Sequence, residues 1–108
     1  MNNIQNIYAS IPDEIPKELF QDILKTDRFK IERIVSKGHA SPEGFWYDQK
    51  EHEWVILLKG RAGLLFEGND KIIELKPGDY INIPARLKHR VQWTDPDVET
   101  VWLAVIYI

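Results

Sequence analysis

The residue best placed to do chemistry is His89, because the pattern around it puts an imidazole on the apolar side of a strand. His89 shares its face with Val91 and Trp93, and charged or polar residues stand between them. Successive side chains in a strand point to opposite faces, so His89 is expected to face inward. A neutral imidazole is a common ligand for zinc, iron, nickel and copper. The alternative is a histidine satisfied by a hydrogen bond inside an aromatic core.

Glu53 is the second candidate, because it opens an apolar run in which Val55 and Leu57 should point the same way. A carboxylate that enters a core needs a cation or hydrogen-bond donors. A metal ion or the guanidinium of Arg61 could meet that need. His89 and Glu53 are therefore the pair we expect to hold a divalent ion, if one is bound.

Composition excludes several other kinds of chemistry. The 108 residues contain no cysteine, which rules out disulfides, thiolate catalysis and cysteine-based zinc sites. A net charge of −3 without a basic cluster argues against a nucleic-acid partner. No apolar run approaches the roughly 20 residues that span a bilayer, and the first residues do not resemble a signal peptide. We expect a single-domain, cytoplasmic protein that does not bind membranes.

A series of short strands separated by turns must position these side chains. Runs of apolar or alternating residues recur about every eight to twelve positions, with Gly, Pro, Asn and Asp between them. This spacing predicts an all-β sandwich or barrel. The predicted strands are residues 29–36, 45–47, 54–58, 61–67, 71–75, 80–83, 88–93 and 99–108.

One helix is predicted before these strands. Pro16 suits the first turn of a helix, and four apolar residues between positions 19 and 24 fall at helical spacing. The spacing predicts two to three turns that end near Asp27. Residues 1–28 would then form an arm and a short helix, and residues 29–108 the barrel.

The second half of the chain resembles one of the two short motifs of the cupin superfamily. That motif runs Gly, five residues, Pro, one residue, Gly, two residues, His, three residues, Asn. Gly78 and Pro84 stand at the expected spacing, and His89 takes the histidine position. Arg86 replaces the second glycine, and Trp93 replaces the asparagine.

The other cupin motif is only half present. It runs His, one residue, His, three or four residues, Glu, six residues, Gly, and Glu53 and Gly60 match its second half. With a three-residue gap, its two histidines fall on Tyr47 and Gln49. With a four-residue gap they fall one residue earlier, again not on histidines. Two of the four usual metal ligands are therefore absent.

The resemblance implies an all-β fold, a cupin-type double-stranded β-helix or jelly-roll barrel, to which the sequence adds one short N-terminal helix. It also implies a cavity in which an amide oxygen could replace a missing histidine ligand. The expected divalent-metal ligands are His89, Glu53 and Gln49, and the other expected pocket residues are Tyr47, Arg61 and Trp93.

Two functions of different classes follow from these residues. The first is a metal-dependent small-molecule enzyme or binder, and isomerase, dioxygenase and decarboxylase chemistry all occur in the family. The second is a metal-free binding or sensing module in which His89, Gln49 and Tyr47 hydrogen-bond a polar ligand. A purely structural dimer is a third. No residue is assigned a catalytic role, and the apolarity of residues 54–58 and 101–108 on both faces predicts a homodimer.

Overall fold

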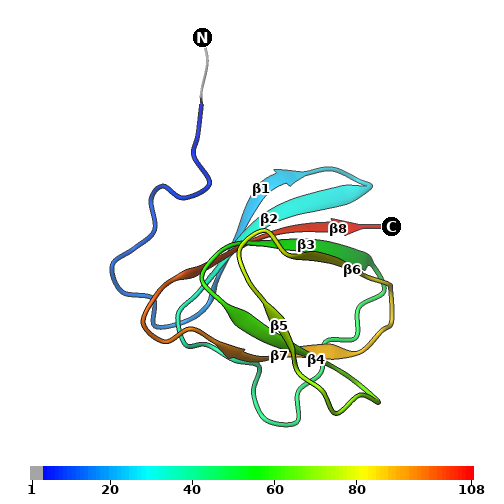
Figure 1. The fold of residues 1–108 in the computed structure, drawn as a ribbon. Helices are drawn as coiled ribbons and strands as arrows, with labels where there is room; N and C mark the ends of the chain where they lie inside the picture. The colour runs from blue at the N-terminus through cyan, green and yellow to red at the C-terminus, as the bar shows by residue number, and fades with distance from the viewer. Residues whose placement is uncertain (1–3) are drawn as a thin grey trace.

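The computed structural model describes residues 4–108 and consists of strands joined by turns and loops (Figure 1). Residues 4–108 contain no helix long and apolar enough to span a membrane. The eight strands are β1 Leu19–Lys25, β2 Phe29–Ser36, β3 His52–Lys59, β4 Ala62–Phe66, β5 Ile73–Leu75, β6 Tyr80–Ile83, β7 His89–Thr94 and β8 Thr100–Tyr107.

The strands form two antiparallel sheets that face each other (Figure 1). The larger sheet has the order β1-β2-β8-β3-β6, and the smaller has the order β5-β4-β7. The core between them consists of inward-facing aliphatic side chains and one indole. Its buried members are Val55, Leu57, Ala62, Leu64, Leu75, Ile83, Trp102 and Ala104.

The predicted N-terminal helix is wrong, because residues 19–25 form strand β1 against β2. A β-bulge between Asp22 and Leu24 explains the error. Leu19 pairs with Val35 and Leu24 pairs with Ile31, so the extra residue of the bulge converts a strand alternation into a spacing that imitates a helix. Pairing along β2 satisfies the backbone of this segment and overrides its weak helical pattern.

Most of the predicted strands are present with small changes at their ends. Residues 29–36 and 80–83 are strands with the predicted limits. Residues 45–47 are different, because only Tyr47 forms a bridge, which pairs it with His89. The rest of that segment is a loop whose backbone is held to β7.

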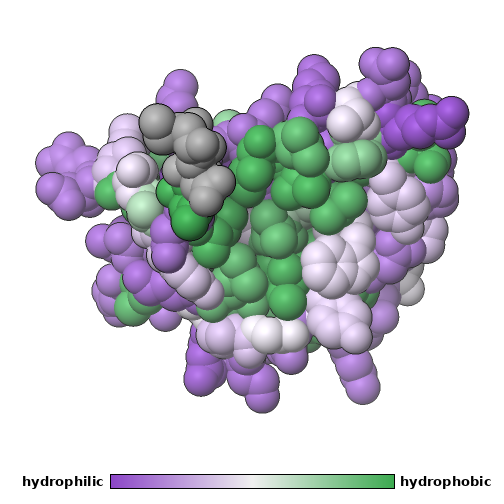
Figure 2. All heavy atoms as spheres, turned by 90° about the horizontal axis from the view of Figure 1, so that it is seen from above, coloured by the Kyte–Doolittle hydropathy of each residue, from purple (hydrophilic) through white to green (hydrophobic). Residues whose placement is uncertain are grey.

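An N-terminal arm, residues 4–18, lies on the outer side of the larger sheet and then extends away from it (Figure 1). Arg33, which is 8% exposed, anchors the arm by donating hydrogen bonds to the carbonyls of Ile7 and Ala9. The same face carries a broad group of hydrophobic side chains bordered by charged ones (Figure 2). Apolar residues therefore occur on both faces of the larger sheet.

Candidate functional site

A cavity of about 80 Å³ lies between the two sheets. Its walls are mostly aliphatic and aromatic, and its polar groups converge from five separate segments of the chain. Ligand sites in proteins commonly combine an apolar wall with a few placed polar groups. The polar lining residues are Glu18, Glu32, Tyr47, Gln49, Glu53 and His89.

His89 lies at the start of β7 and is 5% exposed. Its Nδ1 lies 3.0 Å from the carbonyl oxygen of Leu87, so Nδ1 carries a proton and donates it to that carbonyl. The ring also stacks on Tyr47, with ring centroids 5.4 Å apart. These two contacts fix the ring and direct Nε2 toward Glu53.

Glu53 reaches the cavity from β3, as its alternation with Val55 predicts. Its Oε1 lies 3.7 Å from Nε2 of His89. Gln49 approaches the same oxygen, and its Nε2 donates to Oε1 at 3.4 Å. His89 and Gln49 thus both approach the Glu53 carboxylate, so the three expected metal ligands lie together.

The electrostatics of the pair favour a protonated imidazole. Burial lowers the pKa of His89, but the nearby Glu53 carboxylate and the Leu87 carbonyl act in the other direction and raise the pKa above 6.5. The pKa of Tyr47 is also raised, first by burial and then by the charges of Glu18, Glu53 and Glu32. The negative charges of three carboxylates therefore act on the same end of the cavity.

His89 and Glu53 have the separation that a shared metal ion requires. Two ligands that bind one ion at about 2.1 Å each can lie at most about 4.2 Å apart, and Nε2 and Oε1 are 3.7 Å apart. The bond from Nδ1 to a backbone carbonyl is the usual second contact of a metal-bound histidine. Within residues 4–108, no three His, Cys, Asp or Glu residues cluster to hold an ion. Gln49 must therefore turn its amide oxygen inward, or water must complete the site.

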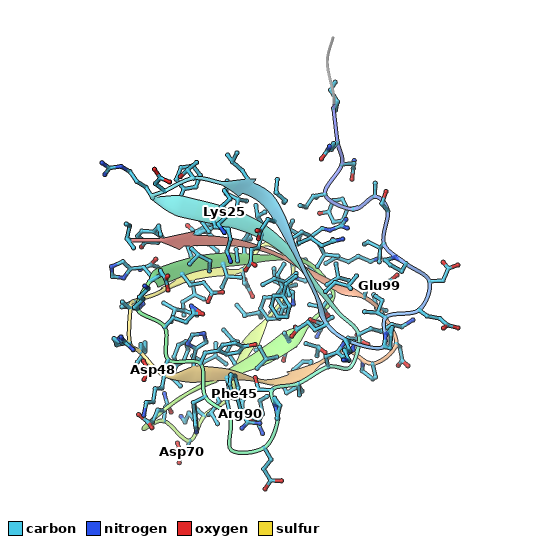
Figure 3. The ribbon with its side chains drawn as sticks, turned by 180° about the vertical axis from the view of Figure 1, so that it is seen from behind. Lys25, Phe45, Asp48, Asp70, Arg90 and Glu99 are labelled. Atoms are coloured by element: carbon cyan, nitrogen blue, oxygen red, sulfur yellow. The ribbon has the colours of Figure 1, made fainter. Side chains whose placement is uncertain are left out.

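The segment that carries Tyr47 and Gln49 is tied to the smaller sheet. The backbone of Tyr47 exchanges hydrogen bonds with that of His89, at 2.7 and 3.1 Å. Arg90 points away from the cavity and donates to the carbonyls of Pro42 and Phe45 on the outer side of β7 (Figure 3). β7 therefore holds Tyr47 in place, and Gln49 is held by the backbone N–H of Arg86, which donates to its carbonyl at 2.7 Å.

Two of the expected pocket residues lie elsewhere. Trp93 does not line the cavity, because the register between β4 and β7 shifts after the Leu64–Val91 pair and Trp93 pairs with Gly63. This bulge reverses the facing that simple alternation predicts for Trp93. Arg61 also lies outside the cavity, where its guanidinium contacts the carboxylate of Glu74 at 3.1 Å.

Two carboxylates in the cavity were missing from the predicted site. Glu32 comes from β2 and Glu18 from the end of the arm, where it accepts a hydrogen bond from Ser36. The sequence pattern that could have predicted Glu32 is its alternation with Ile34, which also lines the cavity. The opposite face of β2 is the more apolar one in sequence, and that face turned out to be the outer one.

The fold and this site define a class of protein, a small β-barrel with a histidine–carboxylate pair in its cavity. The family model described as the cupin domain matches residues 33–106. The chain belongs to the cupin superfamily, as its motifs predict. No curated protein matches it.

Several solved structures are similar to this chain. A Ralstonia eutropha protein, whose assignment as a mannose-6-phosphate isomerase is provisional, is 45% identical, with 98% of each chain covered and a TM-score of 0.94. A cupin superfamily protein from Desulfitobacterium hafniense is 20% identical, with 91% of this chain and 84% of that chain covered and a TM-score of 0.73.

An RmlC-like cupin from Methanocaldococcus jannaschii, described as a double-stranded β-helix, is 18% identical. The match covers 98% of this chain and 93% of that one, with a TM-score of 0.70. The last two likenesses bear on the fold alone. They support the double-stranded β-helix that the sequence predicts.

Proposed function

We propose that this cupin binds a small polar molecule in its barrel through a divalent ion held by His89 and Glu53. One observation carries the proposal. Nδ1 of His89 is committed to the Leu87 carbonyl, and Nε2 faces a carboxylate oxygen 3.7 Å away inside a largely apolar cavity. A metal ion on this pair would act as a Lewis acid toward a ligand oxygen.

The other cavity residues have separate parts in this proposal. Gln49 supplies an amide that can ligate the ion or hydrogen-bond the ligand, and the Tyr47 hydroxyl is a second hydrogen-bonding group. The aliphatic and indole walls exclude water, which strengthens both contacts. The role is binding in the cytoplasm, and no residue is assigned to a catalytic step.

The charge of the cavity narrows the class of ligand. Among the residues that line it, three are carboxylates and none is Lys or Arg. We therefore expect the part of the ligand inside the cavity to be neutral, such as the hydroxyl or carbonyl groups of a sugar. A second, outer pocket of about 420 Å³ at the β1–β2 end shares Glu32 and Gln49 with the cavity. It adds three cationic side chains, Lys25, Arg28 and Lys30, which would contact an anionic group, and two further carboxylates, Asp27 and Glu51, so the pocket has no net positive charge.

This arrangement suits the activity provisionally assigned to the Ralstonia eutropha protein, whose substrate combines a sugar with a phosphate. The sugar would enter the inner cavity, and the phosphate would remain at the outer pocket beside the three cations. Three carboxylates line the same pocket, and Lys30 lies 3.4 Å from that of Glu32, so the positive charge of the three cations is balanced. The outer pocket would thus bind a phosphate weakly.

A metal-free ligand site is the second candidate, and one observation favours it. When His89 is protonated, its contact with Glu53 is an ion pair that needs no third charge. The indole N–H of Trp102, a residue that lines the cavity, also has no hydrogen-bond acceptor among the described residues. A ligand or water oxygen could supply one.

Thermal unfolding of chelator-treated protein separates the two candidates. We expect Zn²⁺, Mn²⁺ or Ni²⁺ to raise the midpoint, and a panel of sugars and sugar phosphates to raise it further only when the ion is present. His89→Gln and Glu53→Gln should abolish the response, whereas Glu43→Gln, at an exposed loop position, should keep it. Stabilisation by a sugar without any ion would favour the metal-free site.

A further inference from the structure

On one side of the cavity, which we call the seam, the two sheets are not joined to each other. β1 is the edge strand of the larger sheet and pairs only with β2. Opposite it, the bridge from Tyr47 to His89 extends the smaller sheet beyond β7. Among residues 4–108, no strand pairing links β1 to this segment. The cavity wall at the seam therefore consists of side chains, which are Glu18 and Phe20 from one edge and Tyr47 and Gln49 from the other.

Phe20 is an unusual part of this wall. It pairs with Ile34, which also lines the cavity, so its ring belongs to the inward face of β1. Phe20 is nevertheless 52% exposed. Of the lining residues, which all lie within residues 4–108, Phe20 alone is exposed, and the others are buried or half-buried. The mouth of the cavity is therefore next to an aromatic ring whose apolar surface is still partly in water.

The size of the cavity leads a ligand to this ring. Small-molecule sites commonly have volumes of about 300–1,000 Å³, whereas this cavity has about 80 Å³. A sugar with one oxygen at the His89–Glu53 pair therefore cannot lie wholly inside. One edge of its ring would enter the cavity, and the rest would stay at the mouth, against Phe20.

Glu18 and Tyr47 add hydrogen-bonding groups at the seam. Burial raises the pKa of Tyr47 most, and Glu18 is the charge with the largest effect on that pKa, so the carboxylate lies near the phenol. Ser36, which is 0% exposed, donates a hydrogen bond to Oε2 of Glu18 and holds it in place. Oε1 of Glu18 can then accept from a ligand hydroxyl, while the protonated phenol can donate to a ligand oxygen.

We propose that Phe20 is a specificity-determining residue, whose ring supports the apolar C–H face of a sugar ring at the seam. A cyclic sugar carries C–H groups on its face and hydroxyl groups at its edge, which matches an aromatic ring flanked by Glu18 and Tyr47. This role rests on the ligand-binding function proposed above, because the opposite edge of the same sugar would reach the His89–Glu53 pair. An open-chain polyol has no such face and would gain little from Phe20.

Calorimetric titration of the Zn²⁺-loaded protein tests this role, with mannose 6-phosphate as the cyclic probe and mannitol 1-phosphate as the open-chain probe. Phe20→Ala should weaken the binding of mannose 6-phosphate about tenfold, the effect of leaving about 50 Å² of apolar surface uncovered. Phe20→Trp, which keeps an aromatic ring, should bind it within about twofold of the wild type. The affinity for mannitol 1-phosphate should change less than about twofold in Phe20→Ala.

Ile23→Ala is the matched control, because Ile23 is 49% exposed on the same strand and does not line the cavity. It should bind mannose 6-phosphate as the wild type does. Undiminished binding of this sugar by Phe20→Ala would overturn the role of Phe20. So would an equal loss in both alanine variants, an equal loss for both probes, or a wild type that does not bind mannose 6-phosphate.

The response to Zn²⁺ alone separates this role from the metal site. Every variant should keep the rise in unfolding midpoint that Zn²⁺ causes, because Phe20 is not one of the proposed ligands. A wild type without that rise would contradict the metal site instead. The same titrations without the ion would then test Phe20, with the same expected ratios between variants.

Discussion

At the scale of single residues, the site depends on how His89 is held rather than on the number of ligands around it. The Leu87 carbonyl fixes the tautomer, Tyr47 stacks on the ring, and Glu53 faces the free nitrogen. Sequence alone predicted His89, Glu53, Gln49 and Tyr47 as neighbours. It could not predict the Leu87 contact, because the backbone conformation before β7 decides it.

The His89–Glu53 pair should make stability depend on pH. Because the pKa of folded His89 is raised, its contribution to stability is complete below pH about 6.5 and is lost as pH rises through the raised value. Urea denaturation should therefore give a lower midpoint at pH 9 than at pH 6. The Glu53→Gln variant lacks the main cause of the raised pKa. Its urea midpoint should therefore fall less between pH 6 and pH 9 than that of the wild type. An equal fall in both proteins would contradict the pairing.

Arg86 gives a second prediction at this scale. It occupies the glycine position of the cupin motif and keeps a glycine-like conformation, with φ of 68°. Its ion pair with Asp48 is solvent-exposed and contributes little. Arg86→Gly should stabilise the protein by about 1 kcal/mol relative to Arg86→Ala, since both lose the ion pair and only glycine relieves the left-handed backbone. Equal unfolding free energies would rule out such strain.

At the scale of elements, β-bulges separate what the sequence predicts from what it does not. Strands with unbroken alternation, such as β2 and β6, have the predicted limits. The bulge in β1 made a strand look like a helix, and the register shift after Val91 turned Trp93 away from the cavity. An extra residue reverses the facing of every later side chain, and no residue type marks its position reliably.

The second bulge places Trp93 against Gly63. This contact can be tested directly. A Cβ at Gly63 would overlap the Trp93 indole and the side chain of Ile72. Gly63→Ala should therefore destabilise the protein by about 1–3 kcal/mol in urea denaturation. The cost should fall in a Trp93→Leu background, where the smaller side chain leaves room. The same cost in both backgrounds would mean that Trp93 is not the obstacle.

At the scale of the whole molecule, β8 explains why the end of the chain is apolar on both faces. Trp102 and Ile106 turn to the cavity, while Leu103 and Val105 turn to the outer face. β8 lies in the middle of the larger sheet, between β2 and β3. One strand thus forms part of the cavity and part of the apolar outer face of the larger sheet. Sequence predicted the two apolar faces and an N-terminal arm, but where the arm lies on the outer face required the structure.

A crystal grown with the ion that gives the largest thermal shift, measured at the absorption edge of that ion, tests the central claim most directly. The account predicts an anomalous peak inside the barrel within about 2.3 Å of His89 Nε2 and a Glu53 carboxylate oxygen. A Glu53→Gln crystal grown in the same way should lack the peak. Ordered His89 and Glu53 side chains without a peak between them, or a peak only outside the cavity, would contradict the proposed metal site.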